Sequence, residues 1–174
     1  MRGIEQTTSA RDALALAIAI ERHNGQRLRE LAHRFRVYDA EASRFLESLA
    51  REEDEHEAEL LKLFAQLFGG EVPPCSPIAL MHYLSGLLVK PRHFFVINPD
   101  MAETLLQMAL HMERYTQQFY QNLAAATSEP QSRAMYARLA AFEGEHERAF
   151  HRRLAAAHAQ PAKSQNATTR PCPN

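Results

Sequence analysis

Residues 49–57 read LAREEDEHE, and ninety positions later residues 139–147 read LAAFEGEHE. Both stretches follow the pattern Leu-Ala-x-x-Glu-x-Glu-His-Glu, and both lie in segments whose apolar residues recur with a helical period. Residues three apart lie on one face of an α-helix, so each stretch places a glutamate and a histidine side by side. The fold and the function both depend on whether that face points to solvent or to the core.

The composition is that of one ordinary globular domain. The chain has 174 residues, of which 45% are hydrophobic and 24% charged, and its formal net charge is -1 without runs of like charge. We therefore expect no nucleic-acid partner. The two cysteines, Cys75 and Cys172, make neither a disulfide framework nor a Cys-x-x-Cys metal pair. The apolar run 14–20 has charged neighbours and is far shorter than the roughly 20 residues of a membrane span, so we expect a cytoplasmic protein without membrane contact.

The apolar pattern predicts an all-α fold of four long helices, in which Ser9 is a favourable first N-cap and Pro130 begins the last helix. Residues 69–99 are too many for a tight hairpin, and we expect them to cross the length of the bundle, with a short helix within 78–89. The four-helix bundle is expected to occupy residues 1–160 and a disordered tail residues 161–174. The expected helices lie near 9–35, 39–68, 100–127 and 130–158.

The first two helices resemble the last two in sequence. Glu21-Arg22 aligns with Glu113-Arg114 at a separation of 92 positions, and the second and fourth helices align at a separation of 90. Two similar hairpins predict a bundle with a pseudo-twofold axis through its core.

Six polar residues interrupt the apolar faces of these helices. Glu53 and His56 fall on the face that carries Leu49 and Leu60, so they point inward, and the second Glu-x-x-His pair does the same. The neighbouring acids Glu52, Glu55, Glu59, Glu145 and Glu147 lie mostly off this face, and we expect them to be solvated. The inward set is Glu21, Glu53, His56, Glu113, Glu143 and His146.

Four inward carboxylates need more positive charge than two histidines supply. Burying an ionised carboxylate costs a free energy of roughly several kcal/mol unless the carboxylate is paired with a cation or a metal. Two divalent metals carry a charge of +4, which matches four glutamates, and each neutral imidazole adds one nitrogen ligand. Carboxylate and imidazole ligands without cysteine favour iron or manganese over structural zinc.

Each element of this pattern also has a structural explanation when it is taken alone. A single Glu-x-x-His is common on a charged helix surface, and a lone inward glutamate can reflect a slight misphasing of the helix. Tyr120 is interpreted first as a core aromatic with a satisfied hydroxyl, and second as a hydrogen-bond partner or electron relay for the site. Gly25 either opens space for dioxygen or marks a helix irregularity. The conjunction of two pairs and two single glutamates, with one group on each helix, is what favours a metal site.

The segments AIERHNG, LAREEDEHEAELL, ALHMERYTQQFYQNLA and LAAFEGEHERAF resemble the rubrerythrin branch of the ferritin-like superfamily, across all four helices. The resemblance implies a ferritin-like four-helix bundle that holds two iron ions, with manganese or a mixed pair as alternatives. It implies all six inward residues as ligands and catalytic residues, with Glu53 and either Glu143 or Glu113 as bridges. Rubrerythrins usually carry another carboxylate at the position of Thr116, so the expected site is more symmetric.

The resemblance also implies an activity. We expect an oxidoreductase that oxidises ferrous iron with peroxide or dioxygen, as a peroxidase or a ferroxidase. This sequence lacks the four cysteines of a rubredoxin domain, so a peroxidase would need a separate electron-donor protein. The alternatives are binding, storage or delivery of iron or manganese without turnover, and a structural site that only tightens the bundle. Relatives of this kind are commonly homodimers or larger homo-oligomers.

Overall fold

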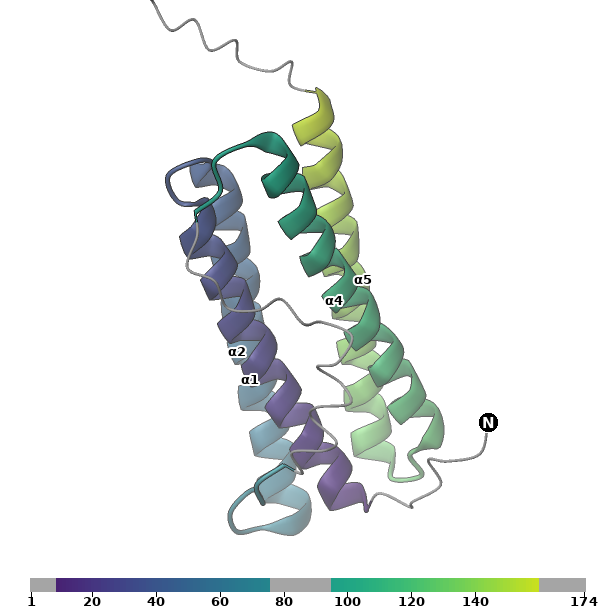
Figure 1. Ribbon diagram of the computed structural model, residues 1–174. Helices are drawn as coiled ribbons and strands as arrows, with labels where there is room; N and C mark the ends of the chain where they lie inside the picture. The colour runs from purple at the N-terminus through teal and green to yellow at the C-terminus, as the bar shows by residue number, and fades with distance from the viewer. Residues whose placement is uncertain (1–8, 76–94, 160–174) are drawn as a thin grey trace, which may run out of the picture.

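The computed structural model describes residues 9–75 and 95–159, which form an all-α bundle of long helices (Figure 1). The predicted all-α, ferritin-like fold class is thereby confirmed. The helix bounds lie within one residue of those expected from the sequence. The helices are α1 (Ala10–Phe35), α2 (Ala40–Phe68), α4 (Pro99–Ala126) and α5 (Pro130–Ala159).

Side-chain caps fix where the helices begin. The Ser9 hydroxyl accepts a hydrogen bond from the Asp12 amide, and the carboxylate of Asp39 accepts bonds from the first turn of α2. Asn98 caps α4 in the same way, with Pro99 at the first helical position. The α2 helix ends where Gly69 and Gly70 adopt positive φ angles of 64° and 67°, a conformation that glycine reaches without steric cost.

The helices pack as two hairpins. Helix α1 packs mainly along α2, and α4 packs mainly along α5, while α2 faces α5 and α1 faces α4 across the middle (Figure 1). Each hairpin has an ion pair at the matching position. Arg22 binds Glu57 at 2.6 Å in the first hairpin, and Arg114 binds Glu147 at 2.6 Å in the second. The internal repeat of the sequence is therefore also a repeat of contacts.

The chain crosses the bundle between α2 and α4. Arg11, at the start of α1, donates a hydrogen bond to the Glu71 carbonyl, which places the end of α2 at that end of the bundle. The Val96 amide donates to the Arg34 carbonyl, which places the start of α4 at the opposite end. The long crossover follows from these two contacts. The short helix expected within 78–89 and the tail expected at 161–174 lie outside the described residues.

Two apolar clusters occupy the two ends of the bundle interior. One combines the later half of α1 and the early half of α2 with residues such as Leu106 and Phe150. The other combines the early half of α1 and the later half of α2 with residues such as Tyr136 and Leu139. Both clusters draw on all four helices, and the middle of the bundle between them is where the buried charges lie. In the described part of the chain, no helix combines the length and apolar character needed to cross a membrane.

Candidate metal centre

The six inward residues predicted from the sequence are all buried in the middle of the bundle. Their exposed fractions are between 0% and 6%, although they are carboxylates and imidazoles. Each helix places its share at the level between the apolar clusters, so that α1 and α4 give one glutamate each and α2 and α5 give a Glu-x-x-His pair each. The residues are Glu21, Glu53, His56, Glu113, Glu143 and His146.

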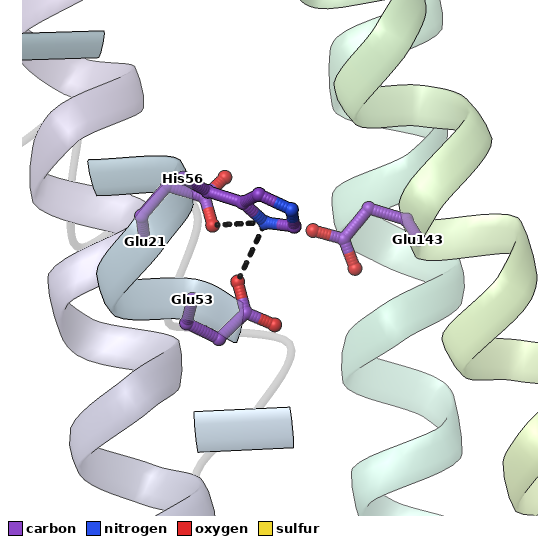
Figure 2. A group of neighbouring side chains, drawn as sticks. All are labelled: Glu21, Glu53, His56 and Glu143. Atoms are coloured by element: carbon purple, nitrogen blue, oxygen red, sulfur yellow. Dashed lines mark ion pairs between the residues drawn. The ribbon is translucent and has the colours of Figure 1, made fainter. Parts of the chain in front are cut away.

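Glu21, Glu53, His56 and Glu143 form the first of two groups with metal-ligand geometry. Figure 2 shows the His56 ring joined by dashed lines to the Glu21 and Glu53 carboxylates, with the Glu143 carboxylate on the other side of the ring. His56 Nδ1 lies 3.6 Å from Glu21 Oε2 and 3.6 Å from Glu53 Oε2. One ligand atom from each of the four residues lies within 4.8 Å of the others, so a single ion can reach all four.

The second group contains Glu113 and His146 together with Glu53 and Glu143. Its four ligand atoms also lie within 4.8 Å of one another. His146 Nδ1 lies 3.3 Å from Glu113 Oε2, 3.4 Å from Glu53 Oε1 and 3.8 Å from Glu143 Oε2. The two groups therefore share Glu53 and Glu143, one from each hairpin, while Glu113 belongs to the second group only.

Crowding and burial raise the pKa values of two of the glutamates. Burial, followed by the nearby Glu53 carboxylate, raises the pKa of Glu21 well above its ordinary value. Burial also raises the pKa of Glu143, and the Glu53 and Glu113 carboxylates add to this shift. Without cations, the interior therefore resists full ionisation of its acids.

The pKa values of the two histidines are raised, and their positive charge partly compensates the charge of the carboxylates. Burial alone would lower the pKa of His56, but contacts with Glu21 and Glu53 raise it to about 9. Burial likewise opposes the shift at His146, where Glu113 and Glu53 raise the pKa to about 11. Burial would raise the pKa of Glu53, yet its contacts with Glu21 and both histidines hold it below its usual range. The metal-free interior is thus a set of carboxylates sharing protons with two imidazoles.

Several buried ligand atoms have no hydrogen-bond partner among the described residues. They belong to five of the six residues, and most are carboxylate oxygens. Native proteins leave few buried polar atoms unsatisfied unless a water, an ion or a function accounts for them. Oxygen and imidazole donors of this number fit two divalent cations. The atoms are Glu21 Oε2, both carboxylate oxygens of Glu53 and of Glu143, Glu113 Oε1 and His56 Nδ1.

Three further polar residues, Tyr120, Asn24 and Thr116, are buried on the same helices as Glu21 and Glu113. The Tyr120 hydroxyl donates a hydrogen bond to Glu21 Oε1, so Tyr120 is both a core aromatic and a partner of the site. The Asn24 amide donates to the Thr116 hydroxyl at 3.1 Å, and that hydroxyl donates to the Met112 carbonyl at 3.0 Å. Asn24 and Thr116 occupy equivalent positions of the two hairpins, so this contact lies where the pseudo-twofold axis passes.

Gly25 lies in a regular stretch of α1, and no helix irregularity is present there. A Cβ atom added at Gly25 would lie 3.4 Å from the Glu53 Cβ and from Asp54 Oδ1. The glycine therefore lets α1 and α2 approach closely beside the inward glutamate.

Glu52 is exposed, as expected from the sequence, but it also makes a contact that the sequence did not predict. Its side chain is 48% exposed, but its Oε2 atom lies 3.2 Å from Nε2 of the buried His146, on the opposite hairpin. Helix phase alone placed Glu52 among the solvated acids. The contact depends on the distance between α2 and α5, which the sequence of one helix does not contain.

Comparisons with known proteins support the predicted resemblance. Residues 12–79 match the family model of rubrerythrin, which confirms the resemblance over the first hairpin. The matched residues include Glu21, Glu53 and His56, and the other three ligand candidates lie in the second hairpin, beyond the match.

One solved structure, a hypothetical protein from Pyrococcus furiosus, is similar to this chain with a TM-score of 0.69. The two chains share 22% sequence identity, and the similarity covers 88% of this chain and 93% of that one. At this identity the similarity concerns the fold alone. None of the curated proteins matches the sequence.

Proposed function

From the rubrerythrin match over the first hairpin and the paired ligand groups, we propose that this chain is a di-iron carboxylate protein of rubrerythrin type. Its proposed activity is oxidation of ferrous iron by peroxide or dioxygen. The observation that carries the proposal is that two four-residue groups share Glu53 and Glu143 and contain the unsatisfied carboxylate oxygens.

In this proposal the shared glutamates would supply ligand atoms to both of two iron ions. Glu21 and His56 complete one ligand set, and Glu113 and His146 complete the other. The four glutamates balance the charge of two divalent ions, and the imidazoles bind as neutral ligands through Nδ1, the atom that faces the carboxylates. Manganese or a mixed pair would use the same ligands.

Two adjacent iron ions supply two electrons together, which suits reduction of an O–O bond. The residues of the chain hold and isolate that pair. Tyr120 orients the Glu21 carboxylate through its hydroxyl, and the apolar clusters above and below exclude water from the layer. In a peroxidase cycle, a separate donor protein would supply the electrons.

Metal analysis and rapid mixing test the proposal. The protein loaded anaerobically with ferrous iron is expected to hold two ions per chain and to gain ferric absorption when mixed with hydrogen peroxide or dioxygen. Glu143→Ala is expected to lose both properties. Glu145→Ala is the matched control, because Glu145 lies two residues away on α5 with a side chain that is 66% exposed.

Three outcomes are informative. Well under two ions per chain in the wild-type protein would contradict a paired site. Two ions without ferric absorption would contradict the oxidoreductase activity and support metal binding, storage or delivery. Equal effects of Glu143→Ala and Glu145→Ala would contradict the assignment of the ligands.

A further inference from the structure

The two hairpins differ at the residue that precedes each shared glutamate. Glu52 precedes Glu53 in the first hairpin, and Phe142 precedes Glu143 at the equivalent position of the second. Both residues reach across the bundle to the histidine of the other hairpin. The repeat therefore places two chemically different groups on the outer sides of two equivalent imidazoles.

Glu52 holds His146 by a charged hydrogen-bond acceptor. Its Oε2 atom lies 3.2 Å from Nε2, while Nδ1 of the same ring faces the carboxylates of Glu113 and Glu53. A carboxylate that accepts the Nε2 hydrogen fixes both the tautomer and the orientation of the ring, and it makes the other nitrogen a stronger metal ligand.

Phe142 covers His56 with an aromatic ring. The ring centroids are 5.0 Å apart and the planes differ by 29°, so the two rings are stacked. Among the residues that the structure describes, the ion pairs of His56 are formed by Nδ1 alone. Stacking limits the motion of the imidazole, but it selects no tautomer and adds no electron density to Nδ1.

A second difference between the hairpins concerns the two single glutamates. The Tyr120 hydroxyl donates to Glu21 Oε1, which leaves Glu21 Oε2 for a metal. The position equivalent to Tyr120 in the first hairpin is Leu28, which has no hydroxyl to donate to Glu113. The group that contains His56 and Glu21 thus has the imidazole without an outer carboxylate acceptor, and its single glutamate has one oxygen bound by a hydroxyl.

We propose that the two metal positions are unequal. The position formed by Glu113 and His146 fills first and holds its ion, and the position formed by Glu21 and His56 fills second and exchanges. Glu52 is the positioning residue that creates this difference in affinity. The equivalent residue beside His56 is Phe142, which supplies no carboxylate. This inference rests on the proposed paired site. Loss of an outer carboxylate partner typically weakens metal binding by about 10–100-fold, so we expect a gap of that size between the two steps.

Anaerobic calorimetric titration of the metal-free protein with ferrous iron tests the inference. The wild-type protein is expected to show two binding steps separated by about 10–100-fold. Glu52→Ala is expected to weaken the tighter step until the two steps merge. Glu55→Ala is the matched control, because it removes the same charge from an exposed residue on the same helix, and it should leave the gap intact.

Two further variants separate positioning from a general effect on folding. Glu52→Gln retains a neutral oxygen acceptor for His146 Nε2, so it should restore part of the gap that Glu52→Ala removes. Phe142→Glu places a carboxylate beside His56, so it should strengthen the weaker binding step. The difference in affinity between the two steps should then become smaller.

The outcomes distinguish this inference from the function on which it rests. Two equal steps in the wild-type protein would overturn the inequality. Equal effects of Glu52→Ala and Glu55→Ala would overturn the assignment of Glu52 as its cause, and both results would leave a paired site in place. Binding of fewer than two ions by the wild-type protein would overturn the paired site itself.

Discussion

The charged layer in the middle of the bundle and the apolar clusters at its ends are equally buried, but burial has opposite consequences in the two regions. Residues such as Leu46 and Leu139 are fully buried, and their removal from water stabilises the fold with or without cations in the middle layer. Glu53 and Glu143 are also fully buried, and their burial costs free energy unless protons or cations neutralise them. The apolar ends thus stabilise a middle layer that is unfavourable on its own.

The apolar packing at both ends of the bundle allows the charged middle layer to form without metal. Apolar packing on both sides draws on all four helices, so it stabilises the bundle above and below the charged layer. Support from packed residues on both sides is what a preorganised metal site requires.

The largest effect is expected from breaking an apolar layer. Leu46→Ala removes a fully buried side chain from the cluster that includes Phe150. We expect the free energy of unfolding to fall by about 2–5 kcal/mol in both the metal-free and the metal-loaded protein, with the metal content unchanged. Chemical denaturation with and without a chelator measures both forms. A loss of bound metal in the folded variant would show that the two regions are not independent.

The next effect concerns the pH dependence of the metal-free protein. His56 and His146 have raised pKa values, about 9 and about 11, so between pH 6.5 and 9 the folded state binds more protons than the unfolded state. Its free energy of unfolding should therefore fall as the pH rises through this window. The raised pKa values of Glu21 and Glu143 act in the same direction, and the lowered pKa of Glu53 acts at lower pH, outside this window.

Bound metal should reverse this dependence, because metal requires deprotonated ligands. The difference in melting temperature between the loaded and the metal-free protein should grow from pH 6 to pH 8. A metal-free protein whose stability is flat across this range would contradict the shifted values.

A smaller effect of opposite sign is expected from Glu143→Gln. The substitution keeps the shape of the side chain but removes a carboxyl group that burial and neighbouring carboxylates disfavour in its charged form. At pH 8 the metal-free variant should be more stable than the metal-free wild type, by about 2 kcal/mol. The same variant should bind fewer ions. Denaturation of both proteins in the presence of a chelator tests the sign, and a loss of stability like that of Leu46→Ala would refute the comparison.

The smallest effect is expected from Tyr120→Phe, which lies where the two regions meet. The substitution keeps the ring in its apolar cluster and removes the hydroxyl that donates to Glu21. We expect a loss of about 1 kcal/mol in the free energy of unfolding of the metal-free protein, with two ions still bound after loading. Unfolding curves and metal analysis measure the two quantities. A much larger loss would mean that the hydroxyl supports more of the layer than Glu21 alone.

The sequence predicted the features that depend on helical periodicity. Glu53 and His56 share a face because they are three residues apart, and the apolar neighbours of that face show that it points inward. Their repetition at Glu143 and His146 predicted the second half of the layer. Caps such as Ser9 and breaks such as Gly69-Gly70 are local signals, so the ends of the helices were also predictable.

Contacts between helices were less accessible to sequence reasoning. Glu52 lies off the inward face of α2 and still reaches His146, because the neighbouring helix lies close enough to meet it. The choice between Glu143 and Glu113 as the second shared carboxylate likewise depends on how the four helices are set against one another, and in the structure it is Glu143 that belongs to both groups. The partner of Tyr120 was open for the same reason. Each of these features is a distance across the bundle, and one-dimensional periodicity does not encode it.

The hydrogen bond between Asn24 and Thr116 shows what a single continuous chain permits at an axis of near symmetry. In a dimer of identical hairpins, the residue on the axis would face its own copy, and one residue type would have to serve as both donor and acceptor. Covalent linkage removes that constraint, so an amide can donate and a hydroxyl can accept at 3.1 Å. Once the two halves are encoded separately, each can accumulate substitutions that the other does not share. Selection can then act separately on each pair of equivalent positions, so the two halves can acquire different roles.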